Sequence, residues 1–321
     1  MTDSTFWIRP HLTPPSPVDA VIFDVDGVLF ETSASFDAAV KATTQDLLTQ
    51  IYGMAAPAPV TQAELGLFRK AGGLNNDWDM AYALIALRLA GRANTPKEVA
   101  AAAAESGGRG RAWAAEILPR RVPLDYDLVV QIFNEYYWGS ERFERVFDLP
   151  ARIDPPQPGF WQREVQLLPA DLPERLRAAG VRAFGIATGR TNDELGLVYE
   201  SAGLDQFIPP AHILTADSLS KPDGRVLDWV LAAMQATAAE AGQPPIRTAI
   251  YCGDTMDDLQ AVVNYRGLAH AEKPVWVGAV AVVKAEDFAF FQRAGSDAAV
   301  EHIGQLDQIV DAINRSSRGV E

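Results

Sequence analysis

Short apolar runs alternate with amphipathic segments over the second half of the chain. Helical spacing of apolar residues recurs over 171–180, 191–203, 224–242, 256–267 and 306–317. Between these segments lie apolar runs that predict strands, namely 181–190, part of 207–217, 248–254 and 273–282. A further buried strand is expected near the start, in "VDAVIFDVDGVLFET" (18–32). Strands that alternate with helices are typical of a parallel sheet covered by helices on both faces.

The stretch from 33 to 163 has a different pattern, with helical periodicity and almost no strand signal. Amphipathic helices are expected over 35–53, 61–72, 77–91 and 125–139. The stretch 96–113 is alanine-rich and then glycine-rich, which predicts a helix that runs into a mobile connector. A proline-rich segment, 155–158, is typical of a linker that returns to the sheet.

These patterns predict an α/β fold with a Rossmann-like parallel sheet sandwiched by helices and an inserted all-helical cap domain. The expected boundaries are an N-terminal extension at 1–17, a core at 18–32 and 164–321, and a helical cap at 33–163. The prolines of the first 17 residues indicate an extended arm that lies on the surface or stays loose.

Composition narrows the class of protein. The 321 residues have a mean hydropathy near zero, a net charge of −14 and dispersed basic residues, which argues against nucleic-acid binding. No apolar run approaches membrane-spanning length, and the N-terminus has no signal-peptide pattern. The single cysteine, Cys252, fits a reducing compartment. A cytoplasmic protein without membrane or nucleic-acid partners is therefore expected, and its oligomeric state stays open.

Polar residues end three of the predicted strands. The first ends in Asp24-Val25-Asp26-Gly27, the second in Thr188-Gly189-Arg190, and the third in Gly253-Asp254. Lys221 opens the helix that lies between the second and third strands. Ligands of open parallel sheets bind beyond the carboxyl ends of the strands, so these groups are expected to share one site.

Several carboxylates in one cleft need a counter-charge, or some of them stay protonated. A hard divalent cation with oxygen ligands supplies it, and Mg²⁺ is the usual one beside phosphate. The Lys221 ammonium and the Thr188 hydroxyl suit a phosphoryl group, and Gly27 lets the backbone approach a ligand with its amide free. A carboxylate in this setting can attack phosphorus, and a second acid two residues on can move protons.

The order of these motifs resembles that of phosphohydrolases of the haloacid dehalogenase superfamily with a helical cap. The resemblance covers roughly 18–313, and within the cap "FRKAGGLNNDWD" resembles a little-characterised subgroup. It implies that Asp24 is the nucleophile and Asp26 the general acid and base. It also implies that Asp24, the Asp26 carbonyl and Asp254 bind Mg²⁺ with support from Asp258. The expected activity is a phosphatase acting on a small phosphorylated metabolite.

Other interpretations of the same residues remain open. The superfamily also contains sugar phosphomutases, and a regulatory or binding protein can use the same fold. Arg190 can reach an anionic substrate or only an acidic neighbour. In the cap, Asn75 and Asn76 either contact the substrate or belong to a helix stop and N-cap. Cys252 is expected to be a packing residue.

Overall fold

The computed structural model describes residues 6–74, 76–155, 158–268 and 275–318. The chain divides into two compact units. One, the core, contains the described residues up to Glu31 and those from Gln166 onward. The other, the cap, is the contiguous stretch Thr32–Val165.

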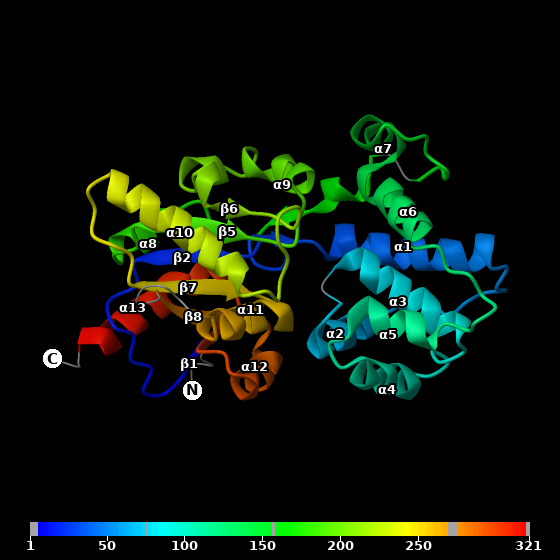
Figure 1. Ribbon diagram of the computed structural model, residues 1–321, viewed down its shortest axis with the longest axis horizontal. Coiled ribbons are helices and arrows are strands. Elements are labelled where there is room, and N and C mark those ends of the chain that lie inside the picture. Colours follow the sequence, from blue (N-terminus) through cyan, green and yellow to red (C-terminus); the bar gives the residue numbers. More distant parts are fainter. Residues whose placement is uncertain (1–5, 75, 156–157, 269–274, 319–321) are drawn as a thin grey trace. The chain divides into compact units, whose positions relative to one another are not determined.

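The core is built on a seven-stranded sheet with the strand order β1-β9-β8-β7-β2-β5-β6 (Figure 1). All neighbouring strands are parallel except β1 and β9. The strands are β1 (Phe6–Ile8), β2 (Ala20–Phe23), β5 (Ala183–Ala187), β6 (Ile213–Leu214), β7 (Thr248–Gly253), β8 (Trp276–Val282) and β9 (Ala298–Val300). Separately, β3 (Phe30–Glu31) pairs with β4 (Val165–Gln166). The predicted α/β class is confirmed.

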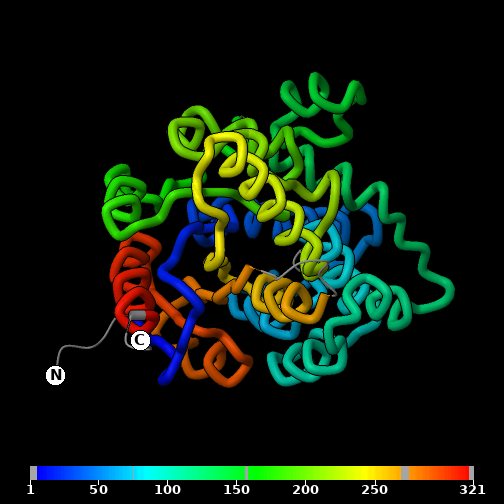
Figure 2. Tube along the Cα trace, turned by 60° about the vertical axis from the view of Figure 1, so that its left-hand side comes forward, coloured from blue at the N-terminus to red at the C-terminus, as the bar shows by residue number. Residues whose placement is uncertain are grey.

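Each face of the sheet has its own apolar layer, because successive side chains of β2 point to opposite sides. Val21 and Phe23 belong to one layer, and Ala20 and Ile22 belong to the other. The first layer is covered by α8 (Leu172–Ala178), α9 (Asn192–Tyr199) and α13 (Leu306–Arg318). The second layer is covered by α10 (Arg225–Glu240), α11 (Met256–Arg266) and α12 (Phe288–Ala294). Figure 2 shows α13 in red on one side of the sheet and α10 in yellow on the other.

The register of the sheet brings the predicted polar residues to one edge. Phe23, the last residue of β2, pairs with Ile186 of β5 and with Cys252 of β7. The strands β5 and β7 each continue for one more residue, so all three strands end within one residue of the same level. They lead into the segments that begin at Asp24, Thr188 and Asp254.

The described part of the N-terminal segment, residues 6–17, is not a loose arm, contrary to one of the two forms expected for it. Phe6–Ile8 pair antiparallel with β9, and the Arg9 guanidinium donates to the Ser296 carbonyl at 2.9 Å. Sequence periodicity missed β1, β9 and α12, because elements of three to seven residues are too short to show a period.

The cap contains only helices among its described elements, apart from Val165 of β4. The first is a continuous helical segment with π-helical ends, η1 (Ser33–Asp37), α1 (Ala38–Asp46) and η2 (Leu47–Ile51). The others are α2 (Gln62–Ala71), α3 (Asp77–Leu89), α4 (Pro96–Ser106), α5 (Gly110–Ile117), α6 (Tyr126–Trp138) and α7 (Ser140–Phe147). One short 3₁₀ turn, η3 (Phe160–Arg163), also lies in the cap. The core contains the short 3₁₀ turns η4 (Leu204–Gln206), η5 (Pro210–His212), η6 (Ala285–Asp287) and η7 (Ile303–Gln305).

The glycine-rich stretch after α4 is not the mobile connector that the sequence predicted. It begins α5, which packs against α3. A Cβ at Gly73 would lie 2.2 Å from the Gly108 carbonyl oxygen, and Gly73 has a φ of +77°. The two glycine-rich turns of the cap therefore cross with their backbones in contact, and only glycine fits at this crossing.

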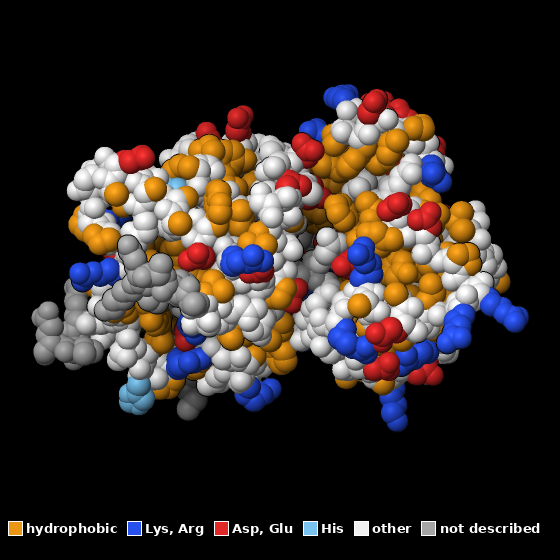
Figure 3. Space-filling view, in the orientation of Figure 1, with side chains coloured by type: hydrophobic (Ala, Val, Ile, Leu, Met, Phe, Trp, Pro, Cys, Tyr) orange, Lys and Arg blue, Asp and Glu red, His pale blue; other side chains and the backbone are white. Residues whose placement is uncertain are grey.

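Charged side chains on the cap surface form pairs. Arg109 donates to Glu116 at 2.6 Å, and Arg92 pairs with Glu105. On the face shown in Figure 3, basic side chains of the cap are interspersed with acidic ones.

No helix in the described part of the chain is long and apolar enough to cross a membrane.

Candidate active site

Asp24 follows β2 directly and is only 3% exposed. Its Oδ2 lies 2.8 Å from the Lys221 Nζ, whereas its Oδ1 is buried and has no hydrogen-bond partner among the described residues. Burial raises the pKa of Asp24 to about 7 although the Lys221 ammonium lowers it. A buried carboxylate oxygen without a partner is costly, so this atom is poised for a ligand that is electrophilic or cationic.

Lys221 lies between two buried carboxylates. Its Nζ is 2.8 Å from Asp24 Oδ2 and 2.6 Å from Asp258 Oδ1. Burial by itself would lower the pKa of Lys221, but the two carboxylates outweigh it and raise the pKa. The side chain therefore stays a cation and offsets part of the negative charge at this edge of the sheet.

Asp258 accepts four hydrogen bonds. Its Oδ1 accepts from Lys221 and from the Tyr251 hydroxyl at 2.8 Å, and its Oδ2 accepts from the Thr255 amide and hydroxyl at 3.0 and 2.6 Å. Burial opposes its ionisation, but Lys221 and the hydrogen bonds lower the pKa of Asp258. Both oxygens are thus fully used, and Asp258 is placed to hold Lys221 and to cap α11.

Tyr251 is the site residue that the sequence analysis missed. It lies on β7 and is fully buried, and its hydroxyl also lies 3.0 Å from the Ala187 carbonyl. Burial and the Asp258 charge raise the pKa of Tyr251, so the hydroxyl stays protonated and can donate to Asp258. A tyrosine inside an otherwise apolar strand was the available signal, because a buried hydroxyl needs a partner.

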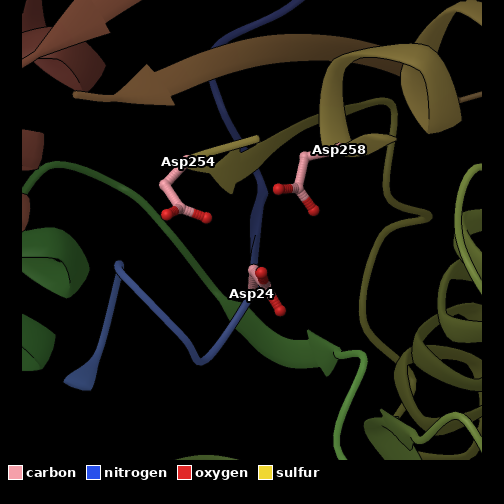
Figure 4. Close-up of side chains that lie close together, drawn as sticks. All are labelled: Asp24, Asp254 and Asp258. Atoms are coloured by element: carbon pink, nitrogen blue, oxygen red, sulfur yellow. The ribbon is translucent and has the colours of Figure 1, made fainter. Parts of the chain in front are cut away.

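Asp254 follows β7, and its carboxyl group converges on those of Asp24 and Asp258 (Figure 4). One oxygen from each of the three lies within 4.8 Å of the others. Gly27 lies directly against this group, because a Cβ there would be 2.1 Å from Asp254 Oδ2, and its φ is +71°. Its amide donates to the Phe30 carbonyl at 2.8 Å and is not free, contrary to the sequence-based expectation.

This arrangement fits a divalent cation. Oxygen ligands are what Mg²⁺ requires, and Asp24 Oδ1 is a buried oxygen that lacks a partner in the described chain. Asp24 and Asp254 are the carboxylates suited to hold the ion. Asp258 would have to give up a hydrogen bond to ligate it directly.

Asp26 is held by Arg190. The Arg190 Nε and Nη2 both donate to Asp26 Oδ1, at 2.9 and 2.7 Å. The Arg190 side chain is 0% exposed, whereas that of Asp26 is 31% exposed. Of the two possibilities left by the sequence, the structure shows Arg190 paired with an acidic neighbour.

Thr188 follows β5 and is buried at the same edge. Its hydroxyl oxygen accepts from the Arg190 amide at 3.2 Å, which leaves the hydroxyl hydrogen for an acceptor such as a phosphoryl oxygen. Gly189 lies in the turn that leads to α9, and Thr191 caps this helix by accepting from the Glu194 amide.

In the cap, Asn75 lies outside the described residues. The side chain of Asn76 is the N-cap of α3, because its Oδ1 accepts from the amides of Trp78 and Asp79 at 2.9 and 3.1 Å. Cys252 is buried, and burial raises the pKa of its thiol, which is the environment of a packing residue.

The structure shows a parallel sheet covered by helices on both faces, a helical insertion after its first polar strand end, and the predicted order of residues along the sheet edge. This is the fold that the resemblance inferred from the sequence implies. No protein-family model matches the chain.

The solved structures that are similar to the chain include the following two. One is a phosphatase, Tt82, from Thermococcus thioreducens, with 23% identity and a TM-score of 0.60. The similarity covers 91% of this chain and 99% of that one. The other is a structural genomics target with 18% identity and a TM-score of 0.58, covering 93% of this chain and all of that one. At these identities the likeness establishes the shared fold.

A curated relative is an imidazoleglycerol-phosphate dehydratase of Phytophthora nicotianae. It is 24% identical over 246 residues, which are 77% of this chain. The match spans only 41% of the length of that relative.

Proposed function

We propose that the protein is a Mg²⁺-dependent phosphatase that hydrolyses a small phosphomonoester through an aspartyl-phosphate. The observation that carries the proposal is Asp24, whose Oδ1 is buried and has no partner in the described part of the chain, while its Oδ2 contacts Lys221. A nucleophile needs an oxygen that no other group occupies, and an anionic substrate needs a fixed cation beside it.

In the first step, an Asp24 oxygen attacks phosphorus while the ester P–O bond breaks. The leaving oxygen takes a proton from Asp26, because an alkoxide is too basic to leave unprotonated. Lys221 and Thr188 offer an ammonium and a hydroxyl to the phosphoryl oxygens.

In the second step, water attacks phosphorus and breaks the bond to Asp24, and Asp26 accepts the proton of that water. Phosphate leaves, and both aspartates return to their starting state. A bound Mg²⁺ would neutralise negative charge on the phosphoryl oxygens. Asp24 and Asp254, with the Asp26 carbonyl that the resemblance implies, are the residues proposed to hold it.

The test is phosphate release from a panel of phosphomonoesters with Mg²⁺ and with EDTA. The panel contains sugar phosphates, phosphoserine, phosphoglycolate and an aryl phosphate. It also contains imidazoleglycerol phosphate, because the curated relative is named for a reaction of that compound. Release that requires Mg²⁺ supports the proposal.

The variant Asp24→Asn is expected to lose turnover by at least about 10³-fold while circular dichroism and the urea midpoint stay near those of the wild type, because the nucleophile is removed. Asp311→Asn, at an exposed position of α13, is the matched control. Full activity of Asp24→Asn would overturn the mechanism. An isomer in place of phosphate would indicate a phosphomutase, and no reaction with any panel member would favour a regulatory or binding role.

A further inference from the structure

We propose that Arg190 is a positioning residue that sets the orientation of Asp26 for proton transfer and so determines which leaving groups the enzyme can expel. This inference rests on the proposed function, because it assigns a role within that reaction. It replaces the alternative in which Arg190 binds the substrate phosphate.

The first argument is the geometry of the contact. Arg190 Nε and Nη2 approach the same atom, Asp26 Oδ1, at 2.9 and 2.7 Å. Two donors from one rigid guanidinium plane fix the position of Oδ1, and because Asp26 is anchored to the backbone, this contact restrains the direction in which Oδ2 points. Within the described chain no side chain donates to Oδ2, so this oxygen is the one presented for proton transfer.

The second argument is how firmly Arg190 itself is held. Its side chain has no exposure to solvent, its amide donates to the Thr188 hydroxyl at 3.2 Å, and its carbonyl accepts from the Ala216 amide at 2.9 Å. Its Nη1 lies 3.5 Å from the carbonyl oxygen of Glu194, a residue in the first turn of α9. The guanidinium is thus a fixed support, whereas Asp26 is 31% exposed and would otherwise rotate.

The third argument is that Arg190 is already occupied. The buried guanidinium already donates to Asp26 Oδ1 and lies near the Glu194 carbonyl. If it turned to a substrate phosphate, it would lose both contacts, and unpaired polar groups are costly in a buried setting. Lys221 and Thr188 already offer donors at the position expected for the phosphoryl group.

The consequence concerns the leaving group. An alkyl phosphate expels a basic oxygen and needs a well-placed proton from Asp26, whereas a nitrophenyl phosphate expels a stable phenolate and does not. Loss of the orientation of Asp26 should therefore slow P–O cleavage in alkyl esters and spare it in activated aryl esters.

The experiment compares Arg190→Met with the wild type on an alkyl phosphate from the active panel and on p-nitrophenyl phosphate. We expect kcat/KM for the alkyl ester to fall about 10²-fold, and kcat/KM for the aryl ester to change by less than about 5-fold. The ratio kcat/KM is used because it reports the first irreversible step, P–O cleavage, and not the later hydrolysis of the aspartyl-phosphate.

Three further measurements separate positioning from structural damage. Arg190→Lys should recover little of the alkyl activity, because an ammonium cannot reproduce two donors in one plane. In Arg190→Ala, added guanidinium ion should restore part of the alkyl activity and leave the aryl activity unchanged. In an Asp26→Asn background, Arg190→Met should cause no further loss on the alkyl ester.

Equal losses on the two esters would overturn the inference and indicate a structural role. A rise in KM shared by both substrates at unchanged kcat would also overturn it, in favour of phosphate binding by Arg190. If the wild type hydrolyses neither ester, the proposed function itself fails, and this outcome is distinct from the other two.

Discussion

Two groups of side chains at the same sheet edge use a buried cation in different ways. In the lysine cluster (Asp24, Lys221, Tyr251, Asp258), the Lys221 ammonium forms ion pairs with two carboxylates that are almost fully buried. In the arginine cluster (Asp26, Arg190, Glu194), the guanidinium is buried but its partner Asp26 opens to solvent.

The two clusters are suited to different tasks: the lysine cluster holds its side chains in place, whereas the arginine cluster supports an acid that transfers protons. Nearly every polar atom of the lysine cluster has a partner, and the exception is Asp24 Oδ1, where chemistry is proposed. The arginine cluster fixes one oxygen of a half-exposed acid and leaves the other accessible. A nucleophile must stay in place, whereas an acid that moves protons must reach both substrate and water.

The largest effect is expected from breaking the lysine cluster with Lys221→Met. Two buried carboxylates would lose their shared cation, and the free energy of unfolding at pH 7 should fall by about 3–5 kcal/mol. Urea denaturation measures it, with the exposed Lys284→Met as the matched control. Equal values for the two variants would show that the carboxylates do not depend on Lys221.

The next largest effect is expected in the arginine cluster, where the free energy of unfolding should depend on pH because of Glu194. Burial raises the pKa of Glu194 to about 7 from its ordinary 4.5, although hydrogen bonds from Thr191 and the charge of Arg190 lower it. The folded protein thus holds a proton that the unfolded chain releases between these pH values. Its stabilising contribution is complete below about pH 4.5 and is lost as the pH rises through about 7.

The variant Glu194→Gln removes this titration. Relative to the variant, the wild type should lose about 3 kcal/mol of unfolding free energy between pH 4.5 and pH 8, as measured by urea denaturation. The exposed Glu286→Gln is the control, and its difference from the wild type should not change with pH. A Glu194→Gln difference that is independent of pH would contradict the proposed burial of a neutral acid.

The smallest effect is expected from Tyr251→Phe, which removes one of the four hydrogen bonds to Asp258. The free energy of unfolding should fall by about 1–2 kcal/mol, because a charged, buried acceptor loses one donor. Tyr265→Phe is the matched control, since its hydroxyl donates to the neutral Val275 carbonyl at 3.2 Å. A larger loss in the control would show that Tyr251 does not support the lysine cluster.

The sequence predicted the shared site because strand ends of a parallel sheet meet at one edge. Asp24, Thr188 and Asp254 could be placed by that rule alone. The pairing of Arg190 with Asp26 could not, because it depends on side-chain rotamers and on the path of the turn after Thr188. Tyr251 was hidden for a related reason, since apolar strands often include a tyrosine.

The short elements of the core escaped prediction for another reason. β1 and β9 have three residues each, and β1 is defined by its pairing with β9, which lies far away in the sequence. In the cap, Gly73 lies in a predicted helix stop and Gly108 in the predicted mobile connector, and the contact between their backbones is also a long-range feature. Local patterns do not carry such information.

The division of the chain also has a consequence for synthesis on the ribosome. The cap is one continuous stretch, so all of its own contacts are available as soon as Val165 has emerged. β2 is made before the cap, but both of its neighbours, β5 and β7, are made after it. The inserted unit can therefore fold during translation, while the sheet and its cluster of aspartates must wait until most of the chain has been synthesised.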